Sequence, residues 1–337
     1  MRVGLTYDLR DEYLAAGYSE VDTAEFDQPE TISAIADALQ RLDMAVDRIG
    51  SARQLTSRLA AGDRWDLVFN FCEGLYGFGR ESLVPALLDA WQIPYVFSDP
   101  LACAITLHKG IAKHVVRGNG LATPDFAVIE TPADIARIGL CYPLFAKPVA
   151  EGTGKGVSAR SRVESRAALE SVCRTLLDQY RQPVLVEEFL PGREFTVGVI
   201  GTGAAAEAIG TMEVQLGPNA DPGIYTFDNK EHWEGRVSYA LLTEEPLLQQ
   251  VETLAVSAWR ALGCRDGGRL DIRLDTEGTP NFIEANPLAG LHPGHSDLPF
   301  ICKFRGLPYD ELIRRIVASA LSRGTQRLAD KPGGPSQ

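Results

Sequence analysis

The chain has 337 residues, of which 45% are hydrophobic and 23% charged, and its formal net charge is −12 at pH 7. This length predicts two or three domains, and the acidic balance argues against nucleic acid as a partner because a phosphate backbone requires clustered Lys and Arg. A nucleotide held by a few local cations and a metal remains compatible with these numbers. No apolar run approaches the length of a membrane span.

The six cysteines are scattered and include no C-x-x-C pair. This pattern is typical of reduced, buried thiols rather than of a disulfide framework or a zinc site. The N-terminus "MRVGLTYDLR" leads straight into a strand, without the apolar stretch of a signal peptide. We therefore expect the protein in the cytoplasm.

The first region, residues 1–103, alternates strands and helices. "RVGLTY" predicts a strand, and "DQPE" predicts a capping box with Asp27 as N-cap and Glu30 three residues later. "WDLVFNF" and "IPYVFSD" predict two more strands around a helix at 82–91, after an acidic, irregular stretch at 8–28. Strand–helix–strand alternation of this kind implies a parallel sheet.

The second region, residues 104–183, begins with a predicted helix at Lys109–Arg117. The strands "DFAVI", "PLFAKPV" and "VSARS" follow, and the last two are joined by a Gly-rich loop. A helix is expected at 164–180. The third region, residues 184–324, contains the strands "PVLVEEFL" and "REFTVGVIG".

The third region continues with a long helix at 246–262, a hairpin at 269–286 and a helix at 309–322. The tail at 325–337 is expected to be disordered. Gly and Pro in "DKPGGPSQ" support that expectation.

The Gly-rich loop "KPVAEGTGKGVS" at 147–158 fits neither the Walker pattern nor the dinucleotide fingerprint, because a strand is expected after it. Its glycines allow successive backbone N–H groups to converge on an anion, and Lys147 just before the loop can reach the same phosphate. The loop alone is equally compatible with a mobile hairpin.

The segment "VLVEEFLPGREFTV" pairs two strand-like runs across a Pro-Gly turn. Phe189 and Leu190 offer an apolar slot for a purine, and Glu194 a carboxylate for ribose hydroxyls. On the pattern alone, a solvated acidic turn is the favoured alternative.

The hairpin "RLDIRLDTEGTPNFIEAN" places Asp271 opposite Glu284 and Arg269 opposite Asn286. Like charges directly across a hairpin are destabilising, but a hard divalent cation between them removes the conflict. Strict alternation assigns Leu270, Ile272 and Leu274 to the core, and Phe282, Glu284 and Asn286 to one face against Ile283 and Ala285. The alternative is an amphipathic hairpin neutralised by Arg269 and Arg273.

Nine motifs, in order from "VFNFCEG" through "YPLFAKPVAEGTGKG", "LVEEFLPGREFTV", "GGRLDIRLD" and "FIEANPLAGL" to "HSDLP", cover most of the chain. Together they resemble the D-alanine–D-alanine ligase branch of the ATP-grasp carboxylate–amine ligases. The resemblance implies a three-domain ATP-grasp fold of α/β and α+β regions: a parallel-sheet N-terminal substrate domain (1–103), a central subdomain with a Gly-rich lid loop (104–183) and a C-terminal subdomain with the metal site (184–324).

The resemblance also implies the roles of individual residues. Arg269 and the backbone at Gly290 stabilise charge on a tetrahedral intermediate, and Lys230 reaches the γ-phosphate. Asp271, Glu284 and Asn286 bind two Mg²⁺ ions, for which Mn²⁺ can substitute. The expected ATP-binding residues are Lys109, Lys147, Glu151, Gly152, Thr153, Gly154, Lys155, Gly156, Glu187, Glu188, Phe189, Leu190, Glu194 and Lys230.

The substrate-contacting segments depart from the family pattern. Glu73 stands where the family has a His, and Glu25 is a stand-in for a Glu that follows the first strand. Ser296 is the candidate for an acceptor carboxylate and Glu73 for a substrate amine. His292 and His295 are expected in a loop near the substrate rather than at a zinc ion, because further ligand spacing is missing.

We therefore expect an ADP-forming ligase that joins small amino-acid-like substrates through an acyl phosphate. The alternatives are an ATP-grasp carboxylase that uses bicarbonate and an ATP-binding module without turnover. Nucleic acid and membranes are not expected as partners, and the family suggests a homodimer.

Overall fold

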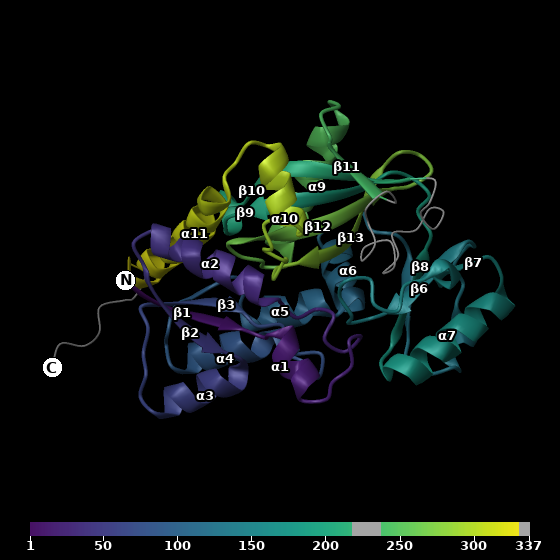
Figure 1. The fold of residues 1–337 in the computed structure, drawn as a ribbon. Coiled ribbons are helices and arrows are strands. Elements are labelled where there is room, and N and C mark those ends of the chain that lie inside the picture. The colour runs from purple at the N-terminus through teal and green to yellow at the C-terminus, as the bar shows by residue number, and fades with distance from the viewer. Residues whose placement is uncertain (218–236, 330–337) are drawn as a thin grey trace.

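The structure, a computed structural model, describes residues 1–217 and 237–329. Its three sheets carry helices on their faces (Figure 1). None of the described helices has both the length and the apolar character needed to cross a membrane. All six cysteines are free, and all but the exposed Cys141 are buried.

The first sheet has the strand order β2-β1-β3-β4, and every pair in it is parallel, as predicted. Its strands are β1 (Arg2–Tyr7), β2 (Ala45–Gly50), β3 (Leu67–Phe71) and β4 (Tyr95–Val96). Its helices are α1 (Arg10–Ala15), α2 (Pro29–Arg41), α3 (Ala52–Ala60), α4 (Leu83–Ala90) and α5 (Pro100–Leu107).

The start of α2 differs from the prediction. Its N-cap is Gln28, with Pro29 in the first turn, and no side-chain capping bond is present. Asp27 is not the cap because its backbone forms a bridge with Leu9, which keeps it extended before the helix begins. The irregular stretch before it also contains the short helix α1, which the sequence did not predict.

The second sheet is antiparallel, with the order β5-β8-β6-β7. Its strands are β5 (Phe126–Ile129), β6 (Leu144–Pro148), β7 (Arg162–Val163) and β8 (Val184–Glu188). The helix α7 (Arg166–Tyr180) packs on this sheet, and α6 (Lys109–Gly118) precedes it in the chain. Figure 1 shows this region, with α7 outermost, at one end of the molecule.

Two expectations about the second region need revision. "VSARS" is not a strand: Ser158 caps a 3-10 turn at Ala159–Ser161, with its Oγ accepting from Arg160 N at 3.2 Å, and only the next two residues pair with β6. In addition, β8 pairs with β5 and β6 rather than with the third sheet. We therefore propose that the third region begins after Glu188 rather than at residue 184.

The third sheet is antiparallel, with the order β11-β10-β9-β12-β13. Its strands are β9 (Glu194–Ile200), β10 (Glu207–Leu216), β11 (Val237–Leu241), β12 (Gly267–Leu274) and β13 (Pro280–Asn286). The helices α9 (Leu247–Ala261), α10 (Asp297–Phe304) and α11 (Tyr309–Ala329) complete the region. Residues 325–329 of the predicted tail thus continue α11, and the rest of it lies outside the described residues.

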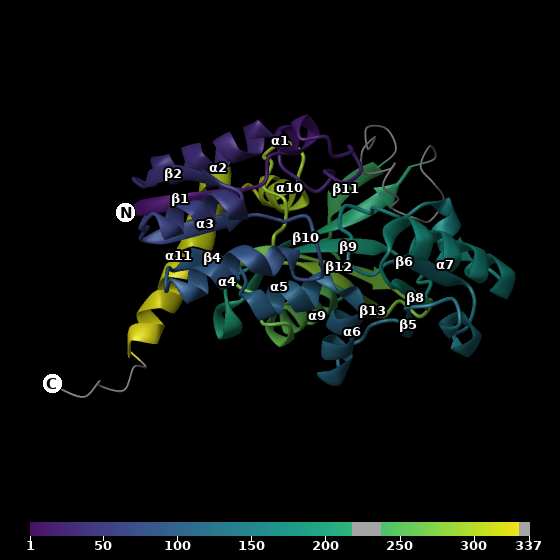
Figure 2. The same ribbon diagram turned by 90° about the horizontal axis from the view of Figure 1, so that it is seen from below.

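The first and third regions share one hydrophobic core. Leu5 and Phe69 of the parallel sheet lie in the same buried cluster as Leu298 of α10 and Ile313 of α11. In Figure 2, which is seen from below, α11 passes behind the strands of the first sheet. This shared core fixes the loops of the parallel sheet against the third sheet, where the cavities described next are found.

Candidate active site

Two cavities adjoin each other at the edge of the third sheet. The first lies between this sheet and the loops of the first region, and the second lies between the second and third sheets. Lys109, Glu151 and Glu284 line both cavities, so the cavities meet at these side chains. A group that reacts across the junction is therefore in contact with residues of the second and third regions.

A buried ion-pair network forms the floor of the second cavity. The Glu187 carboxylate on β8 lies 2.9 Å from Lys147 Nζ on β6 and 2.7 Å from Lys113 Nζ on α6. Burial pushes the pKa of Glu187 upward, but the two lysines together hold it below its ordinary value. Burial lowers the pKa of Lys113 to about 8. Glu187 therefore orients Lys147, a role that the sequence did not predict.

Two ammonium groups approach Glu284 at the junction. Lys109 Nζ lies 3.6 Å and Lys147 Nζ 4.0 Å from its carboxylate. Lys109 Nζ also donates to the Glu151 carbonyl at 2.6 Å. This concentration of positive charge in an acidic protein suits the phosphate groups of a nucleotide.

The Gly-rich loop packs against its own sheet and against the first region. Gly154 and Gly156 have φ of 78° and 79°, a conformation that favours glycine. A Cβ on Gly156 would lie 2.5 Å from the Pro148 ring, so the loop has no room for a side chain there. On the other side, Gly152 N donates to Glu25 Oε1 at 2.9 Å, which connects the loop to the first region.

The hairpin has the predicted register, with Asp271 opposite Glu284 and Arg269 opposite Asn286. The predicted alternation is wrong at one point, because a bulge between Asp271 and Ile272 pairs Ile272 with Phe282. Phe282 consequently joins the core rather than the Glu284 face. The extra residue, Ile283, lines the second cavity beside Glu284. Bulges often re-aim side chains in this way next to active sites.

The apolar end of the second cavity contains Phe189, Leu190 and Ile283. The guanidinium carbon of Arg273 lies 5.0 Å from the centroid of the Phe189 ring, and Arg273 also pairs with Glu194 at 3.1 Å. The Arg162 guanidinium lies 4.6 Å from the same centroid. This end therefore combines a flat apolar surface with a carboxylate held in place by a cation, which are features of a nucleoside site.

The paired carboxylates carry hard oxygen ligands, but they do not form a complete metal cage. Asp271 pairs with Arg269 at 2.6 Å and accepts from Thr196 at 3.0 Å. Arg269 therefore neutralises Asp271, as the alternative of an amphipathic hairpin predicts. Arg273, in contrast, neutralises Glu194, which lies outside the hairpin. Within residues 1–217 and 237–329, no group of three or more His, Cys, Asp or Glu side chains can hold a metal. Asp271, Glu284 and the Asn286 amide fit Mg²⁺ when phosphate and water oxygens complete its shell.

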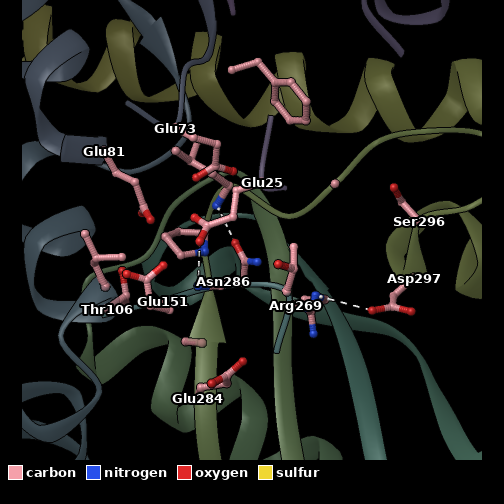
Figure 3. Close-up of a pocket in the computed structure, with 18 of the residues that line it drawn as sticks. Glu25, Glu73, Glu81, Thr106, Glu151, Arg269, Glu284, Asn286, Ser296 and Asp297 are labelled. Carbon is pink, nitrogen blue, oxygen red and sulfur yellow. Dashed lines mark hydrogen bonds and ion pairs between the residues drawn. The ribbon is translucent and has the colours of Figure 1, made fainter. Parts of the chain in front are cut away.

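Arg269 occupies the centre of the first cavity (Figure 3). Its Nε lies 3.5 Å from Asp297, and a Cβ on Gly290 would lie 2.6 Å from Ser296 Oγ. Ser296 Oγ accepts from His292 N at 3.0 Å, which fixes the loop before α10. Burial lowers the pKa of Arg269, but Asp271 and the other carboxylates more than offset this, so the net shift is upward and Arg269 stays ionised.

Four carboxyl groups form an acidic wall on the other side of the first cavity: Glu25, Asp27, Glu73 and Glu81. In Figure 3, Glu25, Glu73 and Glu81 lie away from Ser296 and Asp297. Burial raises the pKa of Asp27 to about 8 and that of Glu81 to about 7, and it raises the pKa of Glu73 as well. The sequence indicated Glu73 and Glu25 but missed Asp27, which was assigned as a helix cap, and Glu81, which belongs to no recognised motif.

Most predicted site residues line these cavities. The second cavity is lined by Lys109, Lys147, Glu151, Gly154, Lys155, Glu187, Glu188, Phe189, Leu190, Glu194, Asp271 and Glu284. The first is lined by Glu73, Glu151, Gly152, Thr153, Arg269, Asn286, Gly290 and Ser296.

Two predicted residues, His292 and Gly156, line neither cavity, and a third falls outside the described residues. His295 lines the first cavity, whereas His292 accepts from Gly294 N at 3.1 Å within its own loop. Gly156 lines neither cavity and faces a separate pocket beside α7. Lys230 lies outside the described residues.

Comparisons with known proteins agree on one family. A family profile described as "D-ala D-ala ligase C-terminus" matches residues 115–318. The D-alanine–D-alanine ligase of Bordetella petrii is 34% identical over 80% of this chain and 79% of its own length. That of Aquifex aeolicus is 30% identical over 86% and 94%. A solved D-alanine–D-alanine ligase from Bacillus anthracis, complexed with ATP, has a TM-score of 0.73 at 20% identity and covers 97% of this chain and 99% of its own.

Proposed function

Because the chain belongs to the D-alanine–D-alanine ligase family of ATP-grasp enzymes, we propose that its second cavity binds ATP and its first cavity binds the two substrates. The reaction class is that of the family, an ATP-dependent, ADP-forming ligation of small amino-acid-like molecules. The observation that carries the proposal is the junction, where Lys109 and Glu284 line both cavities. At this junction a phosphoryl group can be transferred directly from a molecule in the second cavity to a molecule in the first.

In this arrangement the adenine ring packs on Phe189, Leu190 and Ile283, and the ribose hydroxyls share Glu194 with Arg273. Lys109, Lys147 and the N–H groups of the loop at 152–156 hold the phosphates. The ATP-grasp family uses ATP with a divalent metal ion.

We assign two Mg²⁺ ions to Asp271, Glu284 and Asn286, with Mn²⁺ as a substitute. When bound, such ions neutralise phosphate charge as the phosphoryl group is transferred. Mg²⁺ prefers oxygen ligands and keeps phosphate oxygens in its shell, which suits this donor set.

The ligation proceeds in two balanced steps. A carboxylate oxygen of the donor attacks the γ-phosphorus, and ADP leaves with the electron pair of the broken P–O bond. The acceptor amine then attacks the acyl carbon and loses a proton, and inorganic phosphate leaves as the amide forms. Arg269 and the Gly290 N–H are positioned for the negative oxygen of that second step, in the manner of an oxyanion hole. Lys230, outside the described residues, is assigned to the γ-phosphate.

The test measures phosphate release from ATP and Mg²⁺ with pools of amino acids and dipeptides, and identifies products by mass spectrometry. Release coupled to a condensed product is the expected result. Bicarbonate-dependent release would instead support the carboxylase alternative, and tight ATP binding without release in any pool would support a binding module. Either result would overturn the ligase proposal.

Two further expectations come from the family and the sequence. We propose a homodimer and a cytoplasmic location, and size-exclusion chromatography with light scattering measures the first. A mass of one chain, 36.6 kDa, across the working concentration range would contradict the dimer.

A further inference from the structure

The acidic wall of the first cavity has more negative than positive groups. Glu25, Asp27, Glu73 and Glu81 contribute four carboxyls, and the cation that pairs within this set is Arg80, which contacts Glu25 and donates to the Ala150 carbonyl at 2.8 Å. Lys109 is nearby, but its Nζ contacts the Glu151 carbonyl and Glu284 instead. Arg80 also lowers the pKa of Glu73 and of Glu81, so a single guanidinium is shared by three carboxyl groups.

Glu81 is the clearest sign that a ligand belongs here. The residue is only 8% exposed, and among the described residues its carboxylate takes part in no hydrogen bond and no ion pair within 4.0 Å; the charges of Arg80 and Lys109 act on it from farther away. Figure 3 shows it directed into the cavity from the loop before α4. A buried charged group without a partner is costly, and such groups in native proteins call for a specific explanation.

Glu73 is a second carboxyl group in the same part of the cavity. It lines the same cavity from the loop after β3, and the Glu81 charge raises its pKa further above the value that burial already raises. Two like charges in one buried site are stabilised by a cation between them. The α-ammonium of a monoamino acid supplies one positive charge, which cannot satisfy Glu73, Glu81 and the rest of the wall together.

On the proposed assignment, the substrate on this side is the carboxylate donor. Ser296, proposed above for the acceptor carboxylate, lies on the opposite side of Arg269 (Figure 3). We propose that the donor is a diamino carboxylic acid whose second ammonium group binds between Glu73 and Glu81. The proposal rests on the ligase function, because the donor carboxylate has to reach the phosphoryl group at Lys109 and Glu284.

The experiment compares diamino acids with neutral analogues of the same shape. Donors are 2,3-diaminopropionate, 2,4-diaminobutyrate, ornithine and lysine, each in both enantiomers. Their analogues, with methyl in place of the second ammonium, are 2-aminobutyrate, norvaline, norleucine and 2-aminoheptanoate. Hydroxylamine replaces the acceptor, so hydroxamate and ADP report donor activation alone. A charge-assisted contact predicts a kcat/KM about 10- to 100-fold higher for one diamino acid than for its analogue.

Variants connect that preference to the two carboxylates. Glu81→Gln and Glu73→Gln are expected to move the ratio of kcat/KM between the diamino acid and its analogue towards one, mainly through KM. Glu252→Gln, a half-buried carboxyl outside both cavities, is the matched control and keeps the wild-type ratio.

The outcomes separate this proposal from the ligase function. Hydroxamate formation with neutral donors at equal or higher kcat/KM would overturn the diamino donor and leave the ligase intact. A diamino preference that survives both Gln substitutions would overturn the assigned site. Absence of ADP with every donor would overturn the ligase function and this proposal with it.

Discussion

Individual charged side chains determine what each cavity can bind, and Glu284 is both attracted and repelled by its charged neighbours. It faces Asp271 across the hairpin and lies within 4.0 Å of both Lys109 and Lys147. Coulomb attraction to the lysines offsets repulsion by Asp271 while the cavity is empty. When nucleotide and metal bind, the lysines are free to turn to phosphate.

Glu284→Gln is expected to lower kcat by at least about 100-fold with little change in stability, because it removes one of the two metal-binding carboxylates. ADP release and thermal unfolding measure the two effects. Glu277→Gln, on the exposed turn of the same hairpin, is the control. Activity within a few-fold of wild type would refute the metal assignment of Glu284.

Glu81 also predicts a pH dependence of stability. Its pKa of about 7 in the folded protein exceeds the ordinary value of 4.5, so the folded state binds more protons and stability is lost as pH rises through this range. Glu81→Gln should therefore stabilise the protein by about 1–3 kcal/mol at pH 8 and by little at pH 4.5. Urea unfolding at the two pH values checks this, with exposed Glu20→Gln as control. Equal effects at both pH values would contradict it.

At the scale of elements, the Gly-rich loop is shaped by what surrounds it. Gly156→Ala places a Cβ 2.5 Å from the Pro148 ring at a φ of 79°, so the loop has to shift. We expect kcat/KM for ATP to fall by about 10-fold or more, since phosphate contacts depend on the loop backbone. Gly139→Ala, where a Cβ has open space, should match wild type. Wild-type kinetics for Gly156→Ala would show that the loop tolerates displacement.

The sequence predicted elements well where periodicity is strong and poorly where one residue is added or a partner is remote. The parallel sheet and the register of Asp271 with Glu284 are confirmed. The bulge that turns Phe282 inward was not predictable, because hydrophobic alternation continues through it in either register. The start of α2 was missed because its neighbour is Leu9, 18 positions upstream of Asp27.

The candidate site residues also divide into those that the sequence predicted and those that it did not. Lysines and carboxylates next to recognisable motifs were predicted, whereas Glu81 and the orienting role of Glu187 depend on burial that only the folded chain creates. Burial converts an ordinary glutamate into a group with a shifted pKa, and no local pattern carries that information. Tertiary context therefore supplied Asp27 and Glu81 in the first cavity and the orienting contacts of Glu187 in the second.

At the scale of the whole molecule, the shared core makes the first and third regions one unit. Phe69→Ala is expected to cost about 3–5 kcal/mol and to lower hydrogen-exchange protection in both β1 and α11, because Phe69 packs in the cluster that joins them. Leu169→Ala, in the core of the second region, should lower protection around α7 instead. Loss of protection confined to the first region in Phe69→Ala would contradict a common unit.

The position of the acidic wall along the chain has an evolutionary consequence. Glu25, Asp27, Glu73 and Glu81 all belong to the first 103 residues, whereas Lys147, Glu187 and the carboxylate hairpin belong to later segments. On the proposed assignment, mutation or recombination in the early part of the gene exchanges one donor for another while the residues assigned to phosphate transfer are inherited unchanged. Because the two sets of residues lie in different parts of the chain, paralogues can diverge in product and keep the ATP-dependent step.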